Sequence, residues 1–266
     1  MFPNPSFNGK TVLITGAASG IGSACAHRLV LAGAGGLVLV DKDSAALGAL
    51  VDSLTRSDRK LLPIVQDVAD PIDWEESQSR ITTQFGHVDY VIANAGVAAA
   101  APIADMTFEM WRRVMAVNLD GVFLTLQAGF RLIRAGGRGG AMVVTGSASG
   151  VKAEPGVGAY GASKAGAMHL ARIAAREGAP DNIRVNTVLP SGVETPMWRD
   201  VPMFRDLTEK AGGDEAAAFA ELGKMATPLG RYAKPEEIAD LILFLLSDAC
   251  AVVTGAQLGC DGGYAA

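Results

Sequence analysis

The sequence predicts an α/β protein, with one doubly wound, seven-stranded parallel sheet and helices on both faces. Short apolar runs recur along the 266 residues, and most lack polar alternation, as expected of strands covered on both faces. Longer helix-compatible segments separate these runs, a pattern typical of right-handed βαβ units. No repeat or Pro/Ser-rich linker divides the chain, so one domain over residues 1–266 is expected.

The predicted elements follow this alternation. Seven apolar runs predict strands at 11–16, 36–41, 61–67, 88–96, 141–147, 183–190 and 256–263. Helices are expected at 20–33, 44–57, 71–85, 107–135, 158–178 and 235–247. Asp70 directly before Pro71 is a favourable start for the third helix, because an aspartate caps free amides and proline fits the first turn.

Residues 196–226 interrupt the alternation between the sixth and seventh strands. The segment carries Met197, Trp198, Met203 and Phe204, and one amphipathic helix is expected near 214–226. Insertions of this length in compact domains are usually binding loops or lids. We therefore expect a substrate lid at 196–226, with a plain surface elaboration as the alternative.

Charge and composition exclude several classes of function. The 23 basic and 28 acidic residues give a net charge of −5, which does not favour nucleic acid or an acidic membrane as a partner. The first ten residues do not resemble a signal peptide, and the longest apolar run, 241–246, is too short to cross a bilayer. Three cysteines without metal-ligand spacing predict a cytoplasmic protein without a metal site.

A glycine-rich loop joins the first predicted strand to the first helix. Gly16, Gly20 and Gly22 lie in the stretch TGAASGIG, where glycines allow a tight turn and a close backbone approach to a pyrophosphate. The helix that begins there offers free amides, that of Ile21 among them, and the positive end of its dipole. Because the loop follows a strand and precedes a helix, it predicts a dinucleotide site.

Asp41, at the end of the second strand, indicates which dinucleotide. It stands nineteen residues after Gly22, where a carboxylate can accept the adenosine ribose hydroxyls and repel a 2′-phosphate. Ser19 occupies a position where a basic residue could bind that phosphate. Both residues favour NAD over NADP, although Lys42 could turn toward a phosphate.

Further cofactor contacts are expected where the next two strands end. Asp67 and Val68 follow the third strand, where they could flank an adenine. Asn94, Ala95 and Gly96 follow the fourth, where small residues leave room for a ribose at the carboxyl edge of the sheet.

These motifs together resemble the short-chain dehydrogenase/reductase family, in its short single-domain branch. The resemblance covers essentially the whole chain and also includes VNLDGVF at 117–123, VVTGSASG at 143–150, YGASK at 160–164, PSGVET at 190–195 and TGAQLGCDGG at 254–263. It implies a Rossmann-type fold, a homotetramer, and Asn118, Ser147, Tyr160 and Lys164 as catalytic residues. Asn118 is implied to hold a water that links Lys164 to solvent.

Tyr160 and Lys164 lie four residues apart, which places them one turn apart on the same face of a helix. A tyrosine is a weak base at neutral pH, and a nearby cation lowers its pKa. Lys164 is therefore expected to acidify Tyr160 and to bind the nicotinamide ribose. Ser147 would orient the substrate oxygen as charge develops on it.

The family pattern also places the nicotinamide carboxamide on Pro190, Val193 and Thr195. Ser191 stands where the family usually has glycine. The backbone angles of this loop could therefore differ from those of the family. The candidate substrate-binding residues are mostly small or apolar: Val97, Ser149, Val151, Val157, Met197 and Trp198.

The expected function is therefore NAD-dependent interconversion of a hydrophobic secondary alcohol, cyclic, aromatic or steroid-like, and its ketone. A 3-oxoacyl-carrier-protein-type reductase is the main alternative, although it would be expected to prefer NADPH. A lyase or dehalogenase on the same fold is less compatible with Lys164 and the glycine loop, and a catalytically dead binding protein is less compatible with the intact set of four.

Overall fold

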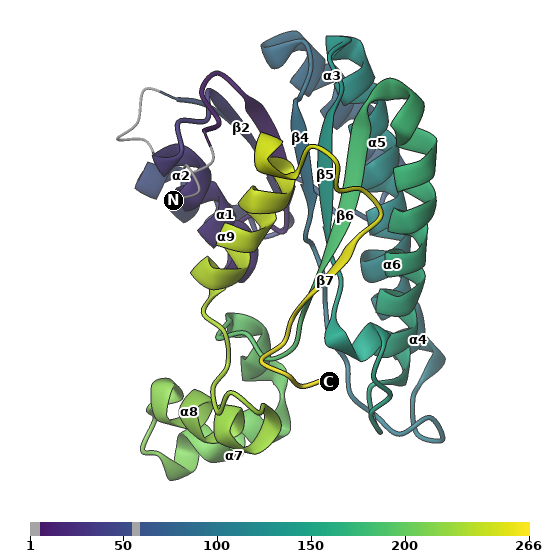
Figure 1. The fold of residues 1–266 in the computed structure, drawn as a ribbon. Helices are drawn as coiled ribbons and strands as arrows, with labels where there is room; N and C mark the ends of the chain where they lie inside the picture. Colours follow the sequence, from purple (N-terminus) through teal and green to yellow (C-terminus); the bar gives the residue numbers. More distant parts are fainter. Residues whose placement is uncertain (1–5, 55–58) are drawn as a thin grey trace.

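The computed structural model describes residues 6–54 and 59–266. Seven parallel strands form one sheet in the order β3-β2-β1-β4-β5-β6-β7, the doubly wound arrangement that the sequence predicts (Figure 1). The strands are β1 (Thr11–Thr15), β2 (Gly36–Asp41), β3 (Lys60–Val65), β4 (Tyr90–Ala93), β5 (Gly140–Thr145), β6 (Ile183–Pro190) and β7 (Gln257–Cys260).

Helices cover both faces of this sheet. One buried cluster joins the sheet to α1 (Gly20–Leu31), α2 (Ser44–Leu54) and α9 (Pro235–Leu246). A second cluster, on the other face, joins it to α3 (Pro71–Phe85), α5 (Gly121–Gly136) and α6 (Gly158–Gly178). Central strands such as β2 and β5 are buried almost throughout, which explains why their sequences are continuously apolar.

The long helix predicted at 107–135 is not one regular helix. It consists of α4 (Phe108–Met115), a π-helical turn (Ala116–Asp120) and α5. Such turns insert one residue into a helix and occur frequently at functional sites. The turn carries Asn118, which is fully buried. The helix predicted at 44–57 is described only to Leu54, and residues 55–57 lie outside the described part of the chain.

Two strands are shorter than predicted for identifiable reasons. The strand predicted at 88–96 is β4, which ends at Ala93, because the amides of Asn94 and Ala95 donate to Oγ1 of Thr15, at 3.0 and 3.3 Å. The strand predicted at 256–263 ends at Cys260 as β7. Beyond it Gly262 and Gly263 have φ of 64° and 86°, and this left-handed backbone ends an extended strand.

Residues 196–226 form a separate helical lobe (Figure 1). It contains α7 (Pro202–Lys210), which the sequence pattern does not predict, and α8 (Glu215–Ala226), which matches the helix expected near 214–226. Phe204, Phe219 and Leu222 pack with Tyr232 in a small core of its own. Within the described ranges no helix has the length and apolarity needed to cross a membrane.

Candidate active site

The glycine-rich loop between β1 and α1 fits a bound pyrophosphate. Gly16 has a left-handed φ of 62°, and a methyl group there would lie 2.8 Å from Cα of Ala95. A methyl group at Gly22 would collide with the carbonyl of Gly16. Only glycine allows this close packing at Gly16 and Gly22, next to the first amides of α1, where an anion would bind.

Asp41 lies at the end of β2 with its carboxylate turned toward this loop. Its Oδ2 accepts a hydrogen bond from the amide of Ala18 at 2.9 Å, and its Oδ1 accepts one from the amide of Asp43 at 3.1 Å. Ser19 adjoins Ala18 and precedes the first turn of α1. The fixed carboxylate beside the glycine loop is the arrangement that recognition of an adenosine ribose requires.

The side chain of Asn94, a predicted cofactor-binding residue, is bonded to the ends of β1 and β5. Its Nδ2 donates to the carbonyls of Thr15 and Gly16 at 3.2 and 3.1 Å, and its Oδ1 accepts from Oγ1 of Thr145 at 3.1 Å. The side chain thus ties the ends of β1, β4 and β5 together and positions the glycine loop. Ala95 lies against that loop and Gly96 against Lys164.

The predicted adenine contacts lie partly in the core. Val68 is 6% exposed, and its carbonyl accepts from the indole of Trp74 at 2.9 Å. Asp67 is exposed, and its Oδ1 accepts from the amide of Ala69 at 2.9 Å. Asp70 caps α3 as expected, by accepting from the amide of Ile72 at 2.8 Å.

The structure brings the four candidate catalytic residues together from three elements. Tyr160 and Lys164 lie on α6, Ser147 follows β5, and Asn118 lies in the π turn. Nζ of Lys164 is 5.7 Å from the centroid of the Tyr160 ring. Ser147 is hydrogen-bonded to Tyr160. A methyl group added at Gly96 would lie 3.4 Å from both Nζ of Lys164 and Oδ1 of Asn118, so this glycine lies between the two polar groups.

Burial dominates the electrostatics of the Tyr160–Lys164 pair. Lys164 is 3% exposed, and this burial lowers its pKa to about 8. Burial raises the pKa of Tyr160, while the hydrogen bond with Ser147 acts in the opposite direction. The ammonium of Lys164 donates to the carbonyl of Thr145 at 2.8 Å, and the acidification of Tyr160 by Lys164 stays a prediction.

Asn118 fastens the π turn to the segment that follows β4. Its Oδ1 accepts from the amide of Val97 at 2.8 Å, and its Nδ2 donates to the carbonyl of Val97 at 2.9 Å. The same Nδ2 donates to Oγ of Ser163 at 3.1 Å. Both side-chain donors are engaged, so the water implied by the resemblance would need another partner, such as backbone opened by the π turn.

The segment predicted to meet the carboxamide lies beside the glycine loop. Pro190 ends β6, and Val193 pairs with Ala233 in an isolated parallel bridge. The side chain of Thr195 lies 3.0 Å from where a methyl group on Gly20 would stand. Among the described residues only Asn182 has a positive φ without being glycine, so Ser191 occupies an ordinary backbone conformation.

The predicted substrate residues divide into two groups. Ser149 and Val151 lie in the loop after β5, and Val157 bridges to Ala101. Met197 is 42% exposed on the helical lobe. In contrast, Trp198 packs within that lobe, 5.1 Å from Tyr232 between ring centroids, and Val97 is bound through its backbone to Asn118.

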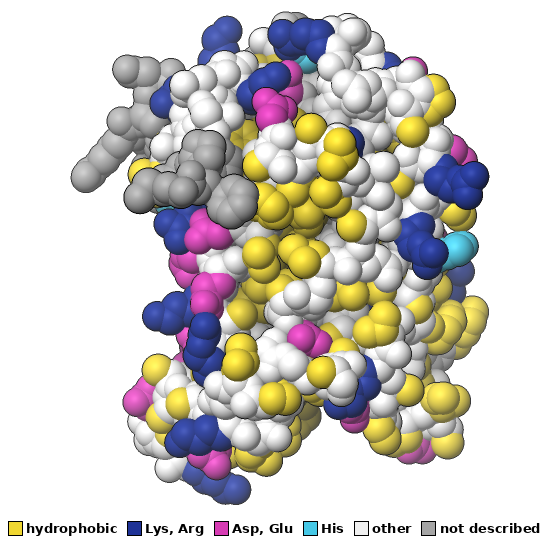
Figure 2. Space-filling model, viewed as in Figure 1, with side chains coloured by type: hydrophobic (Ala, Val, Ile, Leu, Met, Phe, Trp, Pro, Cys, Tyr) yellow, Lys and Arg dark blue, Asp and Glu magenta, His cyan; other side chains and the backbone are white. Residues whose placement is uncertain are grey.

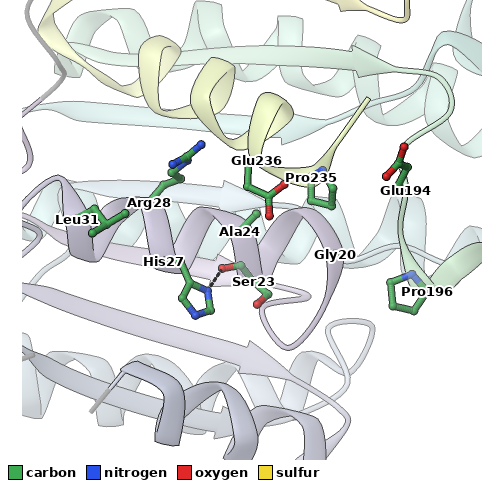
Figure 3. Close-up of a pocket in the computed structure, with 10 residues that line it drawn as sticks. All are labelled: Gly20, Ser23, Ala24, His27, Arg28, Leu31, Glu194, Pro196, Pro235 and Glu236. Atoms are coloured by element: carbon green, nitrogen blue, oxygen red, sulfur yellow. Dashed lines mark hydrogen bonds between the residues drawn. The ribbon is translucent and has the colours of Figure 1, made fainter. Parts of the chain in front are cut away.

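A groove on the outer side of α1 carries different chemistry (Figure 3). His27 and Arg28 line it together with Glu194 and Glu236, and Nδ1 of His27 lies 2.9 Å from the carbonyl of Ser23. None of the four candidate catalytic residues borders this groove. Across the part of the chain that the structure describes, no cluster of three or more His, Cys, Asp and Glu side chains could hold a metal.

Comparisons with known proteins agree with this arrangement. A family model described as enoyl-(acyl carrier protein) reductase matches residues 16–265. The chain is 38% identical to the 3-oxoacyl-[acyl-carrier-protein] reductase FabG of Thermotoga maritima, covering 96% of this chain and 97% of that protein. It is 35% identical to cis-4-hydroxycyclohexanecarboxylate dehydrogenase of Sinomonas cyclohexanicum, covering 98% of both.

Solved structures show the same fold with either nicotinamide cofactor. Carveol dehydrogenase from Mycobacterium avium, in complex with NAD, superposes with a TM-score of 0.91 and 32% identity, covering 98% of this chain and 99% of that one. L-sorbose reductase from Gluconobacter frateurii, complexed with NADPH and L-sorbose, gives a TM-score of 0.91 at 29% identity over 98% of both chains. With these relatives and the family model, the chain belongs to the short-chain dehydrogenase/reductase family, whose members here are oxidoreductases acting on CH–OH groups.

Proposed function

We propose that this protein is an NAD(H)-dependent oxidoreductase that interconverts a hydrophobic secondary alcohol and its ketone. The observation that carries the cofactor choice is Asp41, whose carboxylate is held toward the glycine loop by the amide of Ala18 at 2.9 Å. A carboxylate there accepts ribose hydroxyls and repels a 2′-phosphate.

Each candidate catalytic residue has a separate role at the substrate oxygen or at the group that accepts its proton. The nicotinamide supplies the hydride acceptor or donor. Tyr160 takes the hydroxyl proton during oxidation and returns it during reduction. Ser147, hydrogen-bonded to Tyr160, orients the substrate oxygen as charge develops. Lys164 supplies positive charge beside the phenol, and its lowered pKa suits a group that exchanges protons near neutral pH.

Binding of the cofactor would change the environment of Lys164. In the structure its ammonium donates to Thr145, and Gly96 leaves space beside Nζ. A ribose hydroxyl in that space would offer the ammonium a second acceptor. An ammonium held beside the Tyr160 ring by both acceptors would favour the phenolate and so lower the phenol pKa.

The substrate class follows from the chemistry of the proposed pocket. Val151 and Met197 expose apolar surface at its rim, at 58% and 42%, and Ser149 is the polar group nearest Ser147 along the chain. Apolar walls with a few polar groups suit a hydrophobic alcohol. The similarity to cis-4-hydroxycyclohexanecarboxylate dehydrogenase supports a cyclic substrate.

A 3-oxoacyl-carrier-protein-type reductase is the second candidate, favoured by the 38% identity to FabG of Thermotoga maritima. A lyase or dehalogenase on this fold fits less well, since Lys164 lies beside Tyr160 and the glycine loop is intact.

The deciding experiment measures NADH or NADPH absorbance with a panel of cyclic, aromatic and steroid alcohols. We expect kcat/KM with NAD to exceed that with NADP by at least about 100-fold. The Asp41→Ala variant should lose most of this preference, and the Asp43→Ala variant, two residues away, should keep it. Equal or better turnover with NADP would contradict the cofactor assignment. Activity confined to acetoacetyl thioesters would favour the reductase.

The proposal extends to the protein as a whole. Residues 1–266 would act as one domain, with the helical lobe as a lid over the substrate, in a cytoplasmic homotetramer. Figure 2 shows apolar side chains gathered over α9 and the neighbouring edge strand. Phe244 of α9 is 39% exposed, and Val252, in the loop between α9 and β7, is 97% exposed. Contiguous exposed apolar surface of this kind suits an interface between subunits.

A further inference from the structure

The last six residues, Asp261–Ala266, form an ordered tail with its own cap. The carboxylate of Asp261 accepts from the amide of Gly263 at 3.0 Å and from that of Ala265 at 2.8 Å. The amide of Tyr264 donates to the carbonyl of Asp261 at 3.2 Å. A side chain that binds two amides two and four residues ahead fixes a turn, so the place of Tyr264 is set by the chain itself.

The tail is also fastened to the proposed nicotinamide segment and to the helical lobe. Oγ of Ser191 donates to the carbonyl of Asp261 at 3.0 Å, and the amide of Leu229, just beyond α8, donates to the carbonyl of Gly262 at 3.1 Å. A methyl group on Gly263 would lie 3.0 Å from Pro228. In Figure 1 the C terminus accordingly lies between the helical lobe and the lower end of the α4–α6 layer.

Tyr264 connects this tail to the loop between Ser147 and Tyr160. Nζ of Lys152 lies 4.0 Å from the centroid of the Tyr264 ring and donates to the Tyr264 carbonyl at 2.9 Å. Lys152 also pairs with Glu154 at 3.4 Å. Burial, together with a hydrogen bond to Glu154, raises the pKa of Tyr264 to about 12. Lys152 therefore holds the backbone of Tyr264 through a hydrogen bond and its ring through a cation–π contact.

We propose that Tyr264 is a specificity-determining residue, forming the wall of the substrate pocket between the lobe and the loop after β5. Lys152 and Glu154 position the ring. This inference rests on the proposed function, because it takes the substrate to lie between Ser149, Val151 and the lobe. Lys152 and Glu154 neutralise each other, so the wall is aromatic and carries no net charge, which suits an apolar ring and not a phosphorylated carrier.

The test compares kcat/KM for secondary alcohols of increasing ring size, followed by NADH absorbance. Tyr264→Ala should lower kcat/KM for small cyclic alcohols by about tenfold, because they lose a wall, and leave that for the bulkiest unchanged or raised. The change should lie in KM for the alcohol, with the dissociation constant of NADH unaltered. Tyr264→Phe, which keeps the ring, should keep the wild-type size preference.

Lys152→Met should shift selectivity in the same direction as Tyr264→Ala, by less, because it frees the ring without removing it. Phe244→Ala, a similarly large truncation on α9, is the control and should leave selectivity unchanged. A selectivity ratio of Tyr264→Ala equal to that of the wild type, in a variant with wild-type NADH affinity, would overturn the proposal.

The two proposals fail in distinguishable ways. If the wild type oxidises none of the alcohols, the substrate class is wrong, and the same variants are then compared on short and long 3-oxoacyl thioesters. If Tyr264→Ala leaves the chain-length preference unchanged, Tyr264 does not determine specificity. If the preference changes, Tyr264 determines specificity toward a 3-oxoacyl substrate. The thermal unfolding of each variant is compared with that of the wild type, so that an effect on the pocket wall is distinguished from a loss of folded protein.

Discussion

The indole Nε1 of Trp198 donates to the carbonyl of Val193 at 2.9 Å. The aromatic core of the helical lobe is therefore bonded directly to the segment proposed to hold the nicotinamide carboxamide. Tyr232 completes this connection, since its ring lies 5.1 Å from that of Trp198 and directly over Gly192. Trp198, which the sequence predicts as a substrate-binding residue, therefore also supports the proposed cofactor segment.

Trp198→Phe should weaken cofactor binding while retaining an aromatic ring. Loss of one hydrogen bond costs about 1 kcal/mol. The dissociation constant of NADH should therefore increase about five- to tenfold. The constant is measured by fluorescence titration. Trp111→Phe, the same substitution on α4, is the matched control. An unchanged constant in Trp198→Phe would show that the lobe does not support the cofactor segment.

Gly22→Ala should abolish dinucleotide binding, because the added methyl group would collide with the carbonyl of Gly16. Gly48→Ala in α2 is the control, since no atom lies within 4 Å of its added methyl group. That variant should be more stable by about 0.5–1 kcal/mol. NADH titration and urea unfolding of both variants check the prediction, which tight binding by Gly22→Ala would contradict.

Tyr160→Phe should reduce kcat by about 10³-fold, the range expected for loss of a general acid/base. The ring and its neighbours remain, so the dissociation constant of NADH should change by no more than about threefold. Stopped-flow and steady-state absorbance measure the two quantities. Tyr90→Phe, which removes a hydroxyl from the core strand β4, should keep kcat. A Tyr160→Phe enzyme with normal turnover would overturn the assignment.

Burial of Lys164 should make stability depend on pH in a defined direction. Its pKa is lowered from 10.5 to about 8, so above pH 8 the folded state releases a proton that the unfolded state retains. The free energy of unfolding should therefore rise by about 1–2 kcal/mol from about pH 8 to about pH 9.5. Below pH 8 both states are protonated, and the full cost of burying the charge remains.

Urea unfolding of the wild type and of Lys164→Met measures this effect as a difference between two pH profiles. The rise should be present in the wild type and absent from Lys164→Met. Tyr160, whose pKa is raised in the folded state, acts in the opposite direction only at higher pH, where the unfolded phenol ionises first. Parallel profiles for the two proteins would show that Lys164 is not buried as an ammonium.

The parts of the site that the sequence predicts are those with local causes. The glycine loop and Asp41 depend on one strand, one turn and one helix, and continuous apolar runs mark strands covered on both faces. The indole of Trp198 turns back to a carbonyl only five positions away, a contact that no sequence motif marks. The contacts of the Asn94 side chain could not be predicted, because they depend on carbonyls that only the folded chain brings near. For Asn94 these include that of Thr15, 79 positions away. Helix α7 was missed because its apolar face packs against α8 and Tyr232, not against the sheet.

The π turn at Ala116–Asp120 also makes this part of the chain sensitive to length. One added residue rotates everything after it by about 100° around the helix axis. Deleting a residue between Met115 and Gly121 would restore a regular helix. The deletion would then rotate either Asn118 away from Val97 or α5 away from α3 and β4. We expect related chains to keep the number of residues in this turn and the asparagine at position 118, while the other residue types in the turn vary more.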